Sequence, residues 1–227
     1  MSDPRQAEVR EEAAAGLLAL AERAAALKRV PRTGWLDRGV TADRVESVAD
    51  HTAGVALLAW ACALERRAAG AALDPDRVVT LALLHDLAEA ETGDAPPYDP
   101  RAIPGAEDAE ARRAFLEQRH IRDEHRTAAK RAAEEAAMRA LRDELPATAG
   151  AELRALWDEL QQGSSAEARF VKEVDRLETF LQSLHYRRAD PELPVASFRK
   201  EALEAITDPL LAAIRDAALT SEPSARG

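Results

Sequence analysis

The sequence has little cysteine, few aromatic residues and no long uncharged apolar run, and each scarcity excludes a class of protein. The single cysteine, Cys62, excludes a disulfide framework within the chain and favours a reducing compartment. The longest uncharged apolar stretch, residues 52–64, is too short to span a bilayer. The first residues, MSDPRQAEVREE, lack the basic and hydrophobic segments of a secretory signal. We therefore expect a soluble, cytoplasmic protein with no membrane partner.

Residues that favour strands are also scarce, since aromatic residues make up 4% of the chain and β-branched residues are few. Alanine, leucine, arginine and glutamate are abundant, and these residues favour helices. The length of 227 residues is enough to bury a full core. We expect an all-α protein with one domain over residues 1–220, a core of about residues 15–190, and a disordered tail at 221–227.

The chain is acidic, with a formal net charge of −10, and contains no glycine-rich phosphate loop. Binding to a nucleic-acid backbone requires a basic surface, so we expect no nucleic-acid partner. A small phosphorylated substrate needs only a local positive site and is not excluded.

The most informative stretch is residues 74–97, which contains the dipeptide His85-Asp86. Asp74 followed by Pro75 predicts a helix start, and Gly93 predicts its end, so one helix is expected to carry the dipeptide. Apolar residues recur around His85 at three- and four-residue steps, which places the imidazole on the core side with Glu89 one turn beyond. Burying such groups is costly unless they are paired or bind a metal. A core histidine held by its neighbour would give the same pattern.

Two further helices carry residues of the same kind. The first, over residues 46–67, is opened by a capping box of Ser47 and Asp50, and it places His51 on its apolar stripe. A second buried histidine favours a metal site over a lone core histidine. The other helix, over residues 164–188, is expected to open with Ser164 and Glu167 as a capping box. It carries Asp175 at the edge of its buried stripe, where the carboxylate is either ion-paired with Arg169 or Arg176 or a third metal ligand.

The other segments are predicted mainly as structural elements, with fewer candidate site residues. A helix over residues 6–29 has its apolar anchors at Leu17, Leu18, Leu20 and Leu27. The connector 31–44 contains Trp35 and is either a surface loop with one anchor or a loop that faces a substrate. Residues 106–145 form one or two charged helices, in which His120 and His125, five residues apart, are expected to be surface residues. A short helix covers residues 151–162, and one or two closing helices cover 195–219 with a break at Asp208-Pro209.

Four sequence segments in order resemble the HD-domain superfamily of metal-dependent phosphohydrolases. They are PRTGW (31–35), ESVADH (46–51), HDLAEAETGD (85–94) and SSAEARFVKEVD (164–175). The order of His51, His85-Asp86 and Asp175 on three helices is similar to the signature of that superfamily. The amino-acid sequences of these segments are similar to those of its 5'-deoxynucleotidase branch, including the HD domain-containing protein 2 family. The likeness extends from about residue 15 to 190 and implies the HD-domain helical bundle.

The resemblance also implies roles for individual residues. His51, His85, Asp86 and Asp175 would ligate one divalent metal ion, for which manganese, cobalt, iron and zinc are all suitable. Asp86 and Glu89 would form the catalytic pair, with Glu89 passing a proton to the leaving oxygen. Substrate contacts are expected from four residues: Trp35, Asp94 and, because Gly34 occupies the position of the family's phosphate-binding arginine, Arg32 or Lys172.

The expected activity is the removal of the 5'-phosphate from (deoxy)nucleoside monophosphates, with a homodimer as the expected assembly. The same core could act on another phosphate ester in a specialised nucleotide-derived pathway, since fold and metal site do not fix the substrate. A non-catalytic metal-binding regulator is the alternative from a different class. A two-iron oxygenase is disfavoured because His120 and His125 are badly spaced as extra ligands. The charged segment 106–128 is either a lid over the site or a surface addition.

Overall fold

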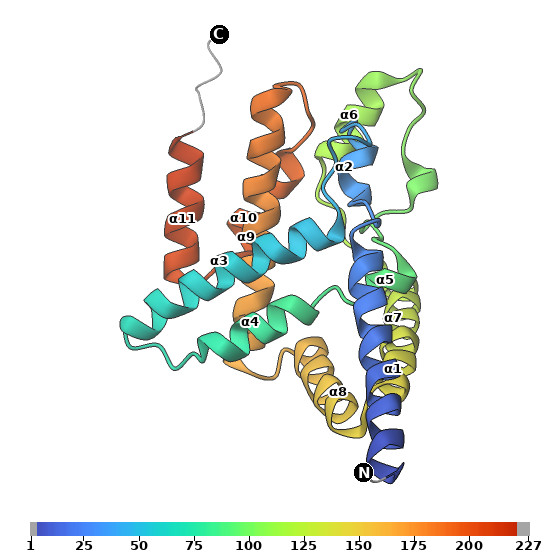
Figure 1. Ribbon diagram of the computed structural model, residues 1–227. Coiled ribbons are helices and arrows are strands. Elements are labelled where there is room, and N and C mark those ends of the chain that lie inside the picture. The colour runs from blue at the N-terminus through green and yellow to red at the C-terminus, as the bar shows by residue number, and fades with distance from the viewer. Residues whose placement is uncertain (1–3, 222–227) are drawn as a thin grey trace.

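The computed structural model describes residues 4–221 as helices joined by loops (Figure 1). Within these residues no strand forms, apart from an isolated antiparallel bridge between Pro31 and Ser47. The all-α prediction is confirmed. The helices are α1 (Pro4–Leu27), α2 (Thr33–Asp37), α3 (Val48–Ala68), α4 (Pro75–Leu84), α5 (Glu89–Thr92), η1 (Pro100–Ala102), α6 (Ala109–Glu117), α7 (Glu124–Glu144), α8 (Ala147–Gln162), α9 (Ala166–Ala189), α10 (Ala196–Ala205) and α11 (Pro209–Thr220).

Two statements about the extent of the fold remain predictions. The tail expected to be disordered lies, from residue 222 onward, outside the described residues. The single domain over residues 1–220 also stays a prediction. No helix in the described part combines the length and the apolar composition needed to cross a membrane.

Helix α9 is the centre of the bundle, where it packs against α3, α4, α8, α10 and α11. Helices α3 and α4 lie side by side against it (Figure 1). The fully buried side chains of Val55, Val78, Leu81 and Val174 belong to the core cluster between these three helices. Because this core fixes α3, α4 and α9 relative to one another, it also fixes the residues that they carry at their ends and edges.

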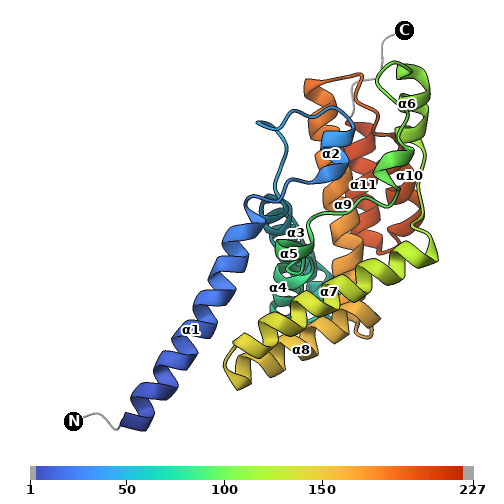
Figure 2. The same cartoon turned by 90° about the vertical axis from the view of Figure 1, so that its right-hand side faces the viewer.

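Helix α1 leaves the body of the molecule over its first half (Figure 2). Leu27, near its end, is buried in a second cluster with Leu141 of α7 and Trp157 of α8. Leu17 and Leu18, expected as buried anchors, have exposed fractions of 52% and 60%. That prediction is wrong because α1 packs through Gly16 against the end of α7, which leaves Leu17 and Leu18 on the exposed side of the helix.

The capping predictions are confirmed at α3 and corrected at α9. Ser47 and Asp50 form the reciprocal capping box at the start of α3. At α9 the cap is Ser165, not Ser164, and its hydroxyl accepts from the backbone N–H of Ala168. Glu167 instead accepts from the backbone N–H of Asp74, which ties the start of α9 to the loop before α4.

The helix predicted to carry the His85-Asp86 dipeptide is interrupted at that point. Helix α4 ends at Leu84, and residues 85–88 form turns before the short helix α5. The backbone hydrogen bonds here span three residues instead of four, as from Glu89 N to Asp86 O. Gly93, at φ +73°, ends α5 as expected. Neither glycine nor proline marks the break after Leu84, so the sequence pattern did not reveal it.

Candidate metal centre and adjoining cavity

The two histidines predicted as metal ligands face each other at the junction of α3 and α4. His51, in the first turn of α3, is fully buried, and its Nε2 lies 3.4 Å from His85 Nε2. The Oδ1 atom of Asp175, from α9, is 3.1 Å from His51 Nε2. The Oδ2 atom of Asp86 is 3.2 Å from His85 Nε2 and 3.8 Å from His51 Nε2. The structure therefore brings all four predicted ligands together.

The outer nitrogen of each imidazole is already engaged. His51 Nδ1 lies 2.6 Å from Glu178 Oε2, and His85 Nδ1 lies 2.6 Å from the carbonyl oxygen of Ala82. An N–H at each Nδ1 that donates to these oxygens leaves both Nε2 atoms free to act as ligands. Ligand atoms bound at about 2.1 Å around one ion are roughly 3.0–3.4 Å apart, which is close to the observed spacing. The donor set fits a divalent cation.

The electrostatics of the cluster point the same way. Burial lowers the pKa of His51, but the Asp175 and Glu178 carboxylates outweigh burial and raise it to about 10. Burial would raise the pKa of Asp86, yet His85 and Arg32 hold it well below its usual value. Carboxylates that favour a proton on a buried imidazole also favour a metal cation in its place.

Among the residues that the structure describes, no arginine forms an ion pair with Asp175. Its partner is His51, whereas the Arg176 guanidinium lies 3.6 Å from Glu201 and Arg169 donates to the carbonyl oxygens of residues 163 and 164. The ion-pair interpretation of Asp175 is therefore wrong, and the interpretation that joins it to the histidines agrees with the contacts.

Glu89, the first residue of α5, is buried beside the cluster with an exposed fraction of 2%. Its Oε1 accepts a hydrogen bond from Lys130 Nζ at 3.0 Å. Burial and, to a smaller extent, the neighbouring charge of Asp86 raise the pKa of the Glu89 carboxyl to about 8, against the opposing charge of Lys130. A carboxyl group with this pKa holds its proton at neutral pH and can donate it.

Arg32, at the N-cap of α2, extends toward the same point. Its Nη1 lies 3.4 Å from Asp86 Oδ2 and 3.9 Å from Asp94 Oδ1. Asp94 in turn accepts from the backbone N–H of Thr33 at 2.5 Å, so it anchors the start of α2. Lys172 does not line the cavity, and its ammonium group lies beside Gly163 at the end of α8. The structure thus places Arg32, but not Lys172, next to the predicted ligands.

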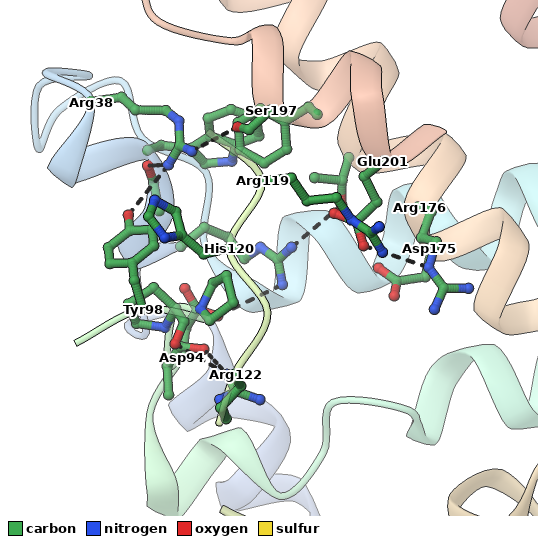
Figure 3. Close-up of a pocket in the computed structure, with 18 of the residues that line it drawn as sticks. Arg38, Asp94, Tyr98, Arg119, His120, Arg122, Asp175, Arg176, Ser197 and Glu201 are labelled. Carbon is green, nitrogen blue, oxygen red and sulfur yellow. Dashed lines mark hydrogen bonds and ion pairs between the residues drawn. The ribbon is translucent and has the colours of Figure 1, made fainter. Parts of the chain in front are cut away.

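A cavity of about 350 Å³ opens beside the cluster (Figure 3). Asp86, Glu89 and Asp175 are among the residues that line it, and Figure 3 shows Tyr98 and His120 across the cavity from Asp175. The remaining walls come from the loop after α5, from the segment between α6 and α7, and from α10. Binding sites for small molecules in proteins are of this size and are lined by a few convergent polar groups.

His120 is one of the residues that wall the cavity, so its prediction as a surface residue is wrong. Its Nε2 lies 2.8 Å from the carbonyl oxygen of Phe115, and its ring packs 4.2 Å from Phe115 and 5.0 Å from Tyr98. His125 is exposed, as expected. Residues 106–145 form two helices, and the segment between them lies over the cavity, which agrees with a lid more closely than with a surface addition.

Trp35 lines the cavity but is 2% exposed. Its Nε1 donates to Glu46 Oε1 at 2.7 Å, and its ring packs 5.1 Å from Tyr186 and 4.5 Å from Phe198. Both interpretations of the connector therefore describe part of it, because the tryptophan anchors the loop in a small core and also forms part of the cavity wall.

Two residues next to the site were not predicted. Glu178 follows Asp175 by one turn of α9, and that three-residue spacing is a signal that could have indicated it. Lys130 comes from α7, whose sequence pattern indicates a solvated helix and contains no motif.

The four predicted ligands, on α3, in the turn after α4 and on α9, lie beside a buried glutamate and a cavity, and this arrangement is typical of a metal-dependent site in a helical protein. Residues 24–208 match the HD domain family, and the chain belongs to that family. The chain is 37% identical to the 5'-deoxynucleotidase HDDC2 of Mus musculus over 172 residues, which are 76% of this chain and 70% of that protein. It is 37% identical to the 5'-deoxynucleotidase HDDC2 of Homo sapiens over 160 residues, which are 70% of this chain and 63% of that protein.

The fold is also similar to a solved structure. A conserved hypothetical protein from Pyrococcus furiosus superposes with a TM-score of 0.63 at 26% identity, over 89% of this chain and 99% of that one. The chain thus spans nearly all of this archaeal protein, but less than two thirds of the length of the human relative.

Proposed function

We propose that this protein is a metal-dependent phosphohydrolase that removes the 5'-phosphate from (deoxy)nucleoside monophosphates. One observation carries the proposal: the converging atoms of His51, His85 and Asp175 lie beside a 350 Å³ cavity that also contains a buried carboxyl group and cationic side chains. The activity in the names of the HDDC2 relatives supports the choice of substrate. A cavity of this volume can hold a small ligand such as a mononucleotide.

The proposed ligands are His51 Nε2, His85 Nε2 and the carboxylates of Asp86 and Asp175. A mixed imidazole and carboxylate set suits manganese, cobalt, iron or zinc. A divalent cation held by these residues supplies Lewis acidity, which polarises the phosphate and lowers the pKa of a water molecule.

The remaining roles follow from the positions of the side chains. Arg32, held between Asp86 and Asp94, presents its guanidinium to a phosphate near the ligands. Glu89 holds a proton at neutral pH and donates it to the leaving 5'-oxygen. Asp94 and Trp35 shape the part of the cavity that receives the sugar. Lys172 has no part in this proposal because it does not line the cavity.

The test is phosphate release by chelator-stripped protein to which manganese, cobalt, iron, zinc or magnesium is restored separately. The panel holds ribo- and deoxyribonucleoside monophosphates, with Asp175→Ala and Glu89→Ala as inactive controls and His125→Ala as an active one. Metal-dependent release that both inactive controls lose supports the proposal and ranks the substrates. No release from any member of the panel by metal-loaded protein refutes the nucleotidase.

We also propose that the protein acts in the cytoplasm as a homodimer. The exposed side chains of Leu57, Trp60 and Leu83 on the adjoining helices α3 and α4 support association with a second copy. Sedimentation equilibrium at micromolar concentration tests the assembly. A wild-type protein that sediments as a monomer at every concentration refutes it.

A further inference from the structure

Lys130 joins helix α7 to Glu89 at the wall of the cavity. Its Nζ lies 3.0 Å from Glu89 Oε1 and 3.0 Å from Glu134 Oε1, and its side chain is 25% exposed and lines the cavity. Glu134 is on α7 itself, one turn further along, so the lysine is held from its own helix and from α5 at once. The distances and the burial are those of a fixed side chain, not of a mobile surface lysine.

The two carboxyl oxygens of Glu89 are in different situations. Oε1 accepts from Lys130, whereas Oε2 is buried and has no hydrogen-bond partner among the described residues. A buried polar atom without a partner costs free energy, so its persistence calls for an explanation. Because Oε2 has no partner in the described part of the chain, the bond from Lys130 to Oε1 is the contact that fixes the orientation of the carboxyl group at the cavity wall.

The surroundings explain why a cation is needed to hold this orientation. Asp86 and Asp94 both act on Glu89 with like charge, and Lys130 and Arg32 act on it with opposite charge. Arg32 is already engaged with the two aspartates and Thr179. Lys130 is therefore the cation that contacts the Glu89 carboxyl group directly.

We infer that Lys130 is a positioning residue whose ammonium group, by holding Glu89 Oε1, fixes the orientation of the Glu89 carboxyl group at the wall of the cavity. The inference rests on the proposed phosphohydrolase function. Two of the three ammonium protons are taken by Glu89 and Glu134, so Lys130 acts through Glu89 and is not the principal phosphate contact.

The kinetic test compares Lys130→Met and Lys130→Arg with Glu134→Gln as the matched control. Glu134 does not line the cavity, and glutamine keeps an oxygen that accepts from Lys130. We expect Lys130→Met to lower kcat by roughly 10- to 100-fold with KM changed by less than about threefold, because general acid catalysis is lost while binding is kept. Lys130→Arg retains more of kcat than Lys130→Met, and Glu134→Gln stays within about threefold of wild type. An unchanged kcat, or a raised KM at unchanged kcat, overturns the inference.

A second test does not depend on turnover. The thermal unfolding of wild type, Lys130→Met, Glu89→Leu and the double variant forms a cycle that measures the coupling between the two side chains, because leucine has no oxygen to accept from Lys130. We expect Lys130→Met to lower Tm by about 5 °C in the wild type and by less than half of that when residue 89 is already leucine. Equal shifts in both backgrounds show no coupling and overturn the inference. If metal-loaded wild type releases no phosphate, the proposed function fails, and the cycle still decides whether Lys130 holds Glu89.

Discussion

Glu178 holds the imidazole of His51 from the side opposite the other predicted ligands. Its Oε2 lies 2.6 Å from His51 Nδ1, while His51 Nε2 lies 3.1 Å from Asp175 Oδ1. Both carboxylates come from α9, one turn apart, so a single helix both orients the histidine and carries a neighbouring predicted ligand. A carboxylate in this position fixes the ring and increases the basicity of the nitrogen that faces the metal.

Replacement of Glu178 by glutamine is therefore expected to weaken metal binding by roughly 10- to 100-fold without abolishing it. Glutamine keeps the shape of the side chain but removes the charge that favours a cation at His51. The measurement is competition for the metal with a chromophoric chelator. Glu173→Gln is the control, because Glu173 lies on the same helix and contacts the backbone N–H groups of Thr207 and Asp208 instead. Equal metal affinity in Glu178→Gln and wild type would contradict the assigned role.

Removal of a proposed ligand is expected to lower metal binding more than replacement of Glu178, which only orients a ligand. Wild-type protein is expected to hold about one divalent ion per chain, and Asp175→Ala to hold less than about a tenth of that after dialysis, because an uncharged methyl group supplies no ligand atom. Elemental analysis of the dialysed proteins gives the ratio directly. His125→Ala is the matched control, since His125 is exposed. A full complement of metal in Asp175→Ala would place the ion elsewhere.

The residues predicted as ligands lie together in the structure, and the sequence could indicate this because local patterns report on burial. His51 falls on the apolar stripe of a capped helix, and Asp175 falls at the edge of another, so periodicity alone indicates that both side chains point inward. The interruption after Leu84 could not be predicted in the same way, since its three-residue hydrogen bonds leave no mark in composition.

Periodicity of the sequence could not predict which residues tertiary contacts bring to the site. Lys130 contacts Glu89 although 41 positions separate the two residues in the sequence. The sequence of α7 is typical of a solvated helix because its buried face is narrow. His120 has the charged neighbours of a surface residue, and only its packing against Tyr98 and Phe115 brings it to the cavity wall. Leu17 and Leu18 show the opposite error, since an apolar pattern indicates what a helix could bury and not which side of it packs against a neighbour.

The buried carboxyl group of Glu89 predicts how stability depends on pH in metal-free protein. Its pKa rises from 4.5 to about 8 on folding, chiefly through burial, with Asp86 and Asp94 raising it and Lys130 and Arg32 opposing them. Between these two pH values the folded protein keeps a proton that the unfolded chain has lost. The free energy of unfolding therefore falls with rising pH, by up to ~1.4 kcal/mol per pH unit from this group.

Glu89→Gln removes that dependence because an amide does not titrate. We expect wild type to lose stability relative to Glu89→Gln as the pH rises from 4.5 to 8, with a constant difference above pH 8. Urea denaturation in the presence of a chelator, repeated at several pH values, measures the difference. A difference that does not change with pH across this window would show that Glu89 titrates as an ordinary exposed carboxyl group.

Trp35 and Trp60 offer a matched comparison of a buried and an exposed tryptophan. Trp35 is 2% exposed and packs against Tyr186 and Phe198, whereas Trp60 is 49% exposed. Trp35→Ala leaves a cavity and removes the hydrogen bond to Glu46, so we expect it to lower the free energy of unfolding by about 3–5 kcal/mol. Trp60→Ala is expected to stay within about 1 kcal/mol of wild type.

Urea denaturation followed by circular dichroism measures both variants. The comparison also decides how a loss of activity in Trp35→Ala is to be interpreted, because an unfolded fraction lowers the apparent kcat without any change at the substrate. Activity must therefore be divided by the folded fraction before a substrate contact is inferred from it. A Trp35→Ala variant as stable as Trp60→Ala would mean that the tryptophan does not anchor the connector, and would leave contact with substrate as its main role.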